Sequence, residues 1–194
     1  FPIMFAEYLA QGYGSDPEIT WLLENRELYI VPIVNPDGVA YNESIAPEGG
    51  GMWRKNRRDN GDGTIGVDLN RNYPYMWGYD NNGSSPYPGD ATYRGPAPGS
   101  EPETQALMGL VEAHEFVAHQ SLHTYGNLTL YPWGYTSTPT PDDAVFDHMG
   151  ETMAMYNGYE YGQAPHVLYT VNGGTFDWSY GAMGVFAFTN EIGG

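Results

Sequence analysis

Residues 53–57 read W-R-K-N-R, and residues 66–73 read G-V-D-L-N-R-N-Y. The chain has only seven Lys and Arg against 24 Asp and Glu, and five of the seven lie between Arg54 and Arg71. A guanidinium group is the best side-chain partner for a carboxylate or a phosphate, and Asn70 adds a neutral donor beside Arg71. Taken alone, the cluster is more typical of a solvated basic loop, so its meaning depends on the rest of the sequence.

The composition indicates a packed globule and excludes several classes of function. A chain of 194 residues with 41% hydrophobic residues is large enough for one core, and we expect one domain over residues 1–194. The net charge of −17 excludes a general nucleic-acid or anionic-membrane binder. Without cysteine there is no thiol nucleophile or thiolate zinc site, and no apolar run reaches membrane-spanning length.

The first part of the chain predicts two helices and a strand. Apolar residues at helical spacing indicate a helix over residues 3–11, and a capping box with proline at 15–18 begins a second helix that reaches about residue 25. The apolar run at 28–34 predicts a buried strand, which ends in the turn sequence N-P-D-G at 35–38.

The rest of the chain alternates loops, helices and strands. Residues 41–99 are rich in Gly, Pro, Asn and Ser, and only 65–69 resembles a strand. Helices are expected from the capping box at 100–103 and over about 140–158, and strands at 116–122 and 185–189. This order predicts an α/β fold with a mixed, largely parallel sheet sandwiched by helices.

Polar residues follow three of the predicted strands. Asn35, His123 and Glu191 each follow the carboxyl end of a predicted strand. Ligands of open α/β sheets bind at that edge, so we expect these residues to gather at one site.

Nine motifs, in order along the chain, resemble the M14 zinc carboxypeptidases, the carboxypeptidase A/T type. Besides the two motifs quoted first, they are N-P-D-G at 35–38, T-Y-R-G at 92–95, S-E-P-E-T at 100–104, H-T-Y at 123–125, L-Y-P-W-G-Y at 130–135, G-G-T-F-D-W at 173–178 and F-T-N-E at 188–191. The resemblance implies the fold of that family and a single partial peptidase domain over residues 1–194.

The resemblance makes His123 a zinc ligand, although a structural histidine is the commoner role for a single His near a strand end. The family takes its other two zinc ligands from an H-x-x-E segment on a central strand near those expected at 28–34 and 116–122, and this sequence has no H-x-x-E. His114 and His119 are five residues apart and would diverge on a helix, so we interpret them as structural. We expect an internal fragment, truncated at both ends, in which Zn²⁺ is absent or incompletely bound.

Two residues resemble the catalytic pair of the family. Glu191 matches the general base that takes a proton from zinc-bound water and passes it to the leaving amine, and its alternative is a surface acid. Arg54 matches the arginine that polarises the scissile carbonyl and stabilises the oxyanion.

The remaining site residues would bind substrate. Asn70 and Arg71 resemble the pair that clamps the terminal carboxylate, and Tyr169 resembles the mobile tyrosine that closes over it, although a core aromatic is the simpler interpretation. Tyr125 resembles a residue of the subsite beyond the scissile bond. Asp68 resembles the acid that orients the first zinc histidine.

The pocket for the leaving side chain is lined, by resemblance, by Leu130, Gly134, Val171, Phe176 and Thr189. Relatives selective for Lys and Arg place an acid at the position of Phe176, because a buried cation needs a counter-charge. Phe176 therefore predicts a preference for neutral, apolar C-terminal residues, with Asp177 pointing away from the pocket.

The leading prediction is a zinc metallocarboxypeptidase that releases C-terminal amino acids from peptides or proteins, secreted or periplasmic, while this fragment alone is not active. The alternative is a metal-free, non-catalytic domain that binds the C-terminal carboxylates of peptides. The absence of H-x-x-E favours the alternative. Retention of Glu191 favours the enzyme, because a pure binder has no use for the base.

Overall fold

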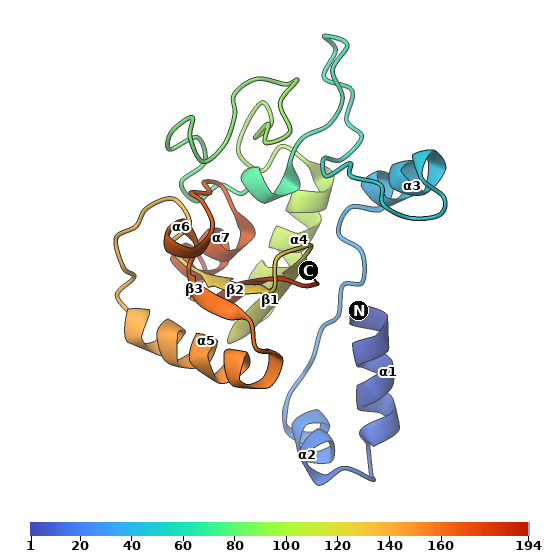
Figure 1. Ribbon diagram of the computed structural model, residues 1–194, viewed down its shortest axis with the longest axis vertical. Helices are drawn as coiled ribbons and strands as arrows, with labels where there is room; N and C mark the ends of the chain where they lie inside the picture. The colour runs from blue at the N-terminus through green and yellow to red at the C-terminus, as the bar shows by residue number, and fades with distance from the viewer. Residues whose placement is uncertain (194) are drawn as a thin grey trace. The chain divides into compact units, whose positions relative to one another are not determined.

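The computed structural model describes residues 1–193 and divides into two compact units, Phe1–Pro36 and Asp37–Gly194. The first unit holds the two predicted helices, α1 (Pro2–Gly12) and α2 (Pro17–Asn25) (Figure 1). Asp16 caps α2, because its carboxylate accepts hydrogen bonds from the backbone N–H groups of Glu18 and Ile19. The predicted cap is thus correct in place but uses Asp16 instead of Ser15. One domain over residues 1–194 stays a prediction.

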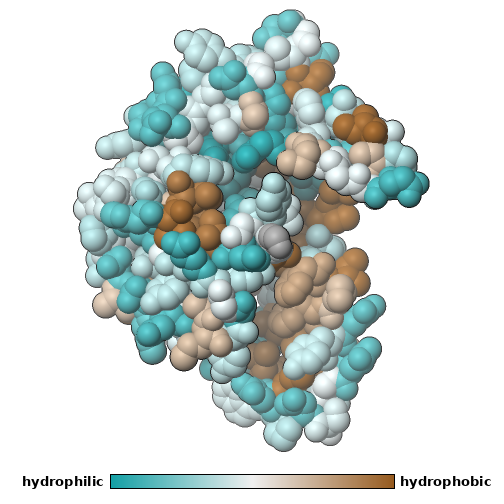
Figure 2. Space-filling model, viewed as in Figure 1, coloured by the Kyte–Doolittle hydropathy of each residue, from teal (hydrophilic) through white to brown (hydrophobic). Residues whose placement is uncertain are grey.

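The prediction of a buried strand at 28–34 is wrong. The backbone there is irregular, and Leu28, Ile33 and Val34 are each at least 40% exposed. A strand needs a neighbour for its backbone hydrogen bonds, and no strand among residues 1–193 pairs with this run. Figure 2 shows apolar side chains gathered over this unit, and Phe1 and Met4 are among the exposed ones.

The second unit begins with a helix where the sequence predicted a turn. Pro36 starts α3 (Pro36–Ile45), since proline is favoured in the first turn of a helix. The predicted strand at 65–69 is reduced to one isolated bridge between Asp59 and Ile65, and the 3₁₀ helix η1 (Leu69–Arg71) follows. The long loop region is otherwise irregular, as predicted.

Four strands form one sheet in the order β1-β4-β2-β3. They are β1 (Ala118–His123), β2 (Leu128–Tyr131), β3 (Glu160–Gln163) and β4 (Phe186–Glu191). The pairs β1–β4 and β2–β3 are parallel, and β2–β4 is antiparallel. This confirms the mixed, largely parallel sheet, in which β1 and β4 lie within two residues of their predicted ranges.

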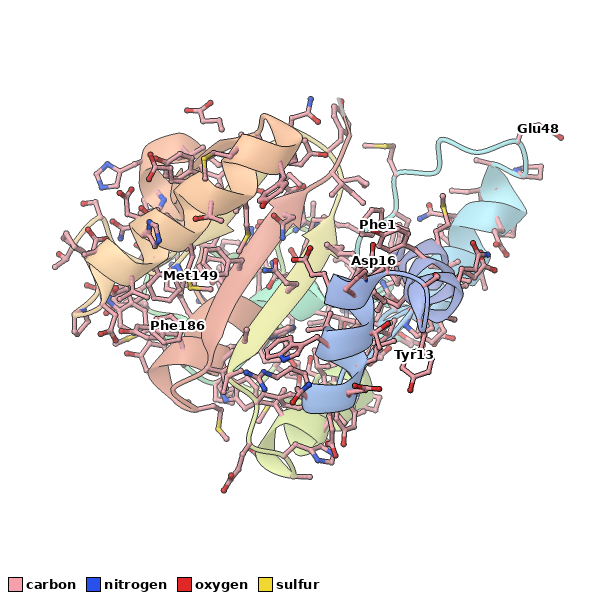
Figure 3. The ribbon with its side chains drawn as sticks, turned by 90° about the horizontal axis from the view of Figure 1, so that it is seen from below. Phe1, Tyr13, Asp16, Glu48, Met149 and Phe186 are labelled. Atoms are coloured by element: carbon pink, nitrogen blue, oxygen red, sulfur yellow. The ribbon has the colours of Figure 1, made fainter. Side chains whose placement is uncertain are left out.

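Helices cover both faces of the sheet. On one face α5 (Asp143–Asn157) places Phe146 against Phe188 of β4, and Figure 3 shows Met149 and Phe186 on this side. On the other face α7 (Thr175–Gly181), with the short α6 (Ala164–Val167), packs Phe176 against Ala187. Because side chains alternate along a strand, Phe188 and Ala187 pack against the helices on opposite faces of the sheet.

The predicted helix after residue 100 is present as α4 (Pro102–Glu112). Its apolar stripe packs Leu107 and Val111 against Trp178 of α7. The predicted capping box is absent, because Glu101 is the N-cap residue and makes no side-chain cap bond. Glu101 is instead buried and pairs with Arg58 at 2.9 Å, which ties α4 to the basic stretch.

Candidate functional site

His123 and Glu191 end the two parallel strands β1 and β4 and are partners in the register. Partnered residues of neighbouring strands point to the same face of the sheet. That face is the one covered by α7, because His119, four residues before His123, has Nδ1 3.0 Å from Oγ of Ser179. The structure thus brings together the predicted zinc ligand and the predicted base.

The basic stretch supplies a second group of charges around Asp68. The buried carboxylate of Asp68 pairs with Arg54 at 2.8 Å, and Nη1 of Arg71 lies 3.9 Å from the same oxygen. Asp68 also caps η1 by accepting a hydrogen bond from the N–H of Asn70. The local fold therefore fixes Asn70 and Arg71 immediately after a buried acid.

The charges of the basic stretch act on both strand-end residues. Burial lowers the pKa of His123 to about 4; Asp68 opposes this, while Arg54 and Arg71 add to it. Burial raises the pKa of Glu191, and the same two arginines oppose that rise. His123 is therefore a neutral imidazole near pH 7, the form that binds metals, and Glu191 is more basic than an exposed carboxylate.

Arg71 is the most deeply buried charge of the site. Its side chain is 2% exposed, Nη1 donates to the carbonyl of Asn70, and Nε has no hydrogen-bond partner among the described residues. A cavity of about 270 Å³ opens beside it, lined by Arg71, Asn82, Gly83, Thr92, Tyr169 and Thr170. A buried guanidinium facing a cavity suits a carboxylate ligand.

Tyr169 lines this cavity, and Asn70 precedes Arg71 in the chain. Burial lowers the pKa of Arg54, but Asp68 and Tyr169 outweigh it and the pKa is raised, which places Tyr169 beside Arg54. The side-chain oxygen of Asn70 accepts hydrogen bonds from the backbone N–H and the hydroxyl of Thr175. Its amide nitrogen is thereby turned away from Thr175 and available as a donor.

Tyr125 lies close to His123 in the chain but is largely in solvent. It follows β1 by two residues and is 70% exposed. Its predicted role in a subsite beyond the scissile bond stays a prediction.

Phe176 lies with three of the residues predicted to line the pocket for the leaving side chain. It packs with Leu130 in a buried cluster. Val171 donates its N–H to the carbonyl of Gly134 at 2.8 Å, and a Cβ on Gly134 would lie 2.7 Å from Cζ of Phe176. Glycine is therefore required at 134, because the loop backbone packs directly on the phenylalanine ring.

Sequence reasoning missed two residues that hold the site. Oγ of Ser121 lies 3.0 Å from Nε2 of His123, within hydrogen-bond distance, and Thr175 fixes Asn70 as described above. The alternation of a strand could have pointed to Ser121, since residues 121 and 123 share a face. Thr175 carries no such signal, because its contact with Asn70 spans 105 residues.

His123 is the one predicted zinc ligand among the described residues. With Ser121 at Nε2, His123 has Nδ1 left for a metal. A catalytic zinc needs three protein ligands, and residues 1–193 contain no cluster of three or more His, Cys, Asp or Glu that could hold a metal ion.

Within the same residues, no helix is long and apolar enough to cross a membrane.

Sequence comparison establishes the family. The sequence model of the zinc carboxypeptidases, Peptidase_M14, matches residues 2–194. Carboxypeptidase A1 of Rattus norvegicus is 35% identical over 198 residues, which cover 98% of this chain and 46% of the rat protein. A metallocarboxypeptidase A-like protein of Trichophyton verrucosum is 37% identical over 202 residues, with 97% and 46% covered. The chain belongs to the zinc carboxypeptidase family and spans a little under half the length of these relatives.

Solved structures confirm the fold class. The crystal structure of thrombin activatable fibrinolysis inhibitor matches with a TM-score of 0.88 and 29% identity, covering 98% of this chain and 49% of that one. Carboxypeptidase A from Helicoverpa armigera matches with a TM-score of 0.74 and 30% identity, covering 84% and 41%. The predicted α/β fold of this family is therefore correct.

Proposed function

We propose that this chain is the substrate-binding and proton-transferring part of a zinc metallocarboxypeptidase that releases C-terminal residues from peptides or proteins. The observation that supports it most is the register of His123 with Glu191, at a strand edge where Arg54 and Arg71 also act on both side chains. Such an arrangement combines a metal-ligating imidazole, a base and two anion-binding groups.

Each residue has a separate task in this proposal. Zinc, when bound, would lower the pKa of a water molecule, so that the water can lose a proton and attack a carbonyl near pH 7. Glu191 accepts the proton and later donates it to the leaving amine. Arg54, half-exposed beside Asp68, stabilises the negative charge that develops on the scissile oxygen. Arg71 and the amide of Asn70 hold the terminal carboxylate, and Tyr169 closes over it.

Zinc binding requires ligands beyond His123. The resemblance assigns them to an H-x-x-E segment, which residues 1–194 do not contain. We propose that Nδ1 of His123 is one ligand and that residues 1–194 alone do not catalyse hydrolysis. Phe176 supports a preference for apolar C-terminal residues, worth roughly 10- to 200-fold over charged ones. Secretion or a periplasmic location stays a prediction.

The non-catalytic alternative rests on one observation. Arg71 is buried with an unpartnered Nε beside a cavity, while the described residues offer a single candidate zinc ligand. These features suffice to bind a peptide carboxylate without chemistry. In that case peptides with a free C-terminus would bind residues 1–194 and amidated peptides would not.

The variant Glu191→Gln distinguishes the two proposals. It is tested in a protein that contains both this chain and an H-x-x-E segment. We expect kcat to fall about 10²- to 10⁴-fold with little change in KM, because the base acts in the reaction and not in binding. Glu151→Gln, an exposed acid of α5, is the matched control and should have no effect. Unchanged hydrolysis by Glu191→Gln would refute the enzyme proposal.

A further inference from the structure

Asp177 of α7 is a fully buried acid that the proposed reaction does not use. Its side chain is 0% exposed, with Oδ1 2.8 Å from the N–H of Gly134 and Oδ2 3.2 Å from the N–H of Tyr135. Among the described residues, no salt bridge reaches this carboxylate. Burying a carboxylate without a cation is costly, so its two backbone partners are what hold it in place.

The loop that Asp177 binds is also held from another side. Nε2 of Gln163 donates to the carbonyls of Trp133, Thr136 and Thr138 at 3.1, 2.7 and 3.0 Å. Gln163 thus fixes the carbonyl groups of the loop to β3. The N–H groups of Gly134 and Tyr135 are fixed by Asp177, which supplies the hydrogen bonds from α7 to this part of the loop, beside the ring contact of Trp133 with Tyr180.

The same loop forms a wall against Phe176. A Cβ on Gly134 would lie 2.7 Å from Cζ of Phe176 and 3.0 Å from the carbonyl oxygen of Val171, so the backbone of Gly134 is in close contact with both residues. Because Phe176 and Asp177 are consecutive, the acid that binds the loop and the ring that touches it move as one unit. A small shift of the loop therefore changes the space between Gly134 and Phe176.

This wall lies next to the proposed carboxylate clamp. A Cβ on Gly174 would lie 3.6 Å from the side-chain oxygen of Asn70, 3.7 Å from Cε1 of Phe176 and 3.2 Å from Cγ1 of Val171. A substrate residue whose carboxylate binds Asn70 would therefore place its side chain near Phe176. The distance between the loop and Phe176 then decides how large a side chain fits.

We propose that Asp177 is a positioning residue that sets the size selectivity of the pocket for the leaving side chain, by holding the loop at Gly134 and Tyr135 against Phe176. It touches neither substrate nor zinc. The inference rests on the proposed carboxypeptidase function and adds to it the group that controls which C-terminal residues are accepted.

The link responds to pH. Burial raises the pKa of Asp177 to about 7, against the two N–H groups that lower it. The titratable groups facing it are Tyr75 and Tyr135. Burial, and next to it the charge of Asp177, raise the pKa of Tyr75, and burial, Tyr75 and Asp177 raise the pKa of Tyr135, so both hydroxyls are neutral near pH 7. Protonation replaces charge-assisted hydrogen bonds with weaker ones, so the wall loosens as the pH falls through about 7.

The test compares kcat/KM for matched peptides ending in Phe and in Ala, from pH 5.5 to 8.5, in the protein that joins this chain to an H-x-x-E segment. In the unmodified protein we expect the Phe/Ala ratio to rise as the pH falls, because a looser wall admits the larger ring. Titration of Glu191 changes kcat/KM of both substrates by the same factor, so it does not change their ratio. This comparison needs no variant and so does not depend on how a variant folds.

Asp177→Asn should keep the loop at Gly134 and Tyr135 in its loosened arrangement at every pH. We expect its Phe/Ala ratio at pH 8.5 to be about 10-fold higher than that of the unmodified protein, through KM more than kcat, and independent of pH. Asp143→Asn, a partly exposed acid in the first turn of α5, is the matched control and should keep the original profile.

The failures of the two proposals differ. No hydrolysis of any peptide by the unmodified protein refutes the proposed function and this pocket with it. Normal hydrolysis with a Phe/Ala ratio that neither pH nor Asp177→Asn changes refutes the role of Asp177 alone. Backbone N–H signals of Gly134 and Tyr135 that do not follow the titration of the Asp177 carboxyl by NMR would refute it as well.

Discussion

The strands β1 and β4 carry the two central side chains of the site but are supported very differently. β4 pairs with β1 and β2, and its four inner residues are buried between the helix layers. β1 pairs only with β4 among the described residues, and alternate residues along it are exposed. Glu191 is thus placed by packing, whereas His123 is placed by hydrogen bonds and by the charges of the basic stretch.

The largest expected difference between the two strands is in stability. Phe188→Ala on β4 should lower the free energy of unfolding by about 3–5 kcal/mol, because it empties a site between Tyr131 and Phe146. Leu122→Ala on β1 should cost under about 1 kcal/mol, since its side chain is partly in water. Urea unfolding of both variants measures this, and equal losses would contradict the comparison.

Acid should weaken the β1 side through His123. Its folded pKa of about 4 lies below the usual value of 6.5, so the unfolded chain binds more protons between these values. Stability from His123 is therefore present above pH 6.5 and lost as the pH falls toward 4, by at most about 3 kcal/mol.

The measurement is the difference in unfolding free energy between the unmodified chain and His123→Asn over this range, in which contributions of other groups cancel. A difference that does not change with pH would show that His123 is not buried as described.

The smallest expected effects concern two hydroxyl groups, one on each strand. Ser121→Ala on β1 removes the partner of Nε2 of His123 and should cost about 1 kcal/mol. Thr189→Val on β4 replaces a buried hydroxyl that has no partner among the described residues, so it should be neutral or slightly stabilising. Thermal unfolding of both variants checks the signs, and a loss in Thr189→Val as large as in Ser121→Ala would contradict this account.

Much of the fold was predictable because its signals are local. β4 continues an apolar run, α4 and α5 begin near proline and acidic residues, and Gly158 closes α5 in the left-handed conformation at φ 70°. The strands β2 and β3 have four residues each, too few for a periodic signal. The run 28–34 has the composition of a strand but no partner, which sequence composition does not reveal.

The same limit applies to the site. Motifs located His123, Glu191, Arg54 and Arg71; the two arginines lie at Asp68, and His123 and Glu191 are partners in the strand register. The residues that hold them in place act through contacts between distant segments, as Thr175 does on Asn70 and Asp177 on Gly134. No local pattern marks such contacts.

The burial of Arg71 has a consequence for the approach of substrate. The cavity is lined by this guanidinium within a molecule of net charge −17. An acidic peptide is repelled at long range and attracted only near the cavity. Salt screens the long-range term first, so added salt should speed the association of acidic peptides instead of slowing it.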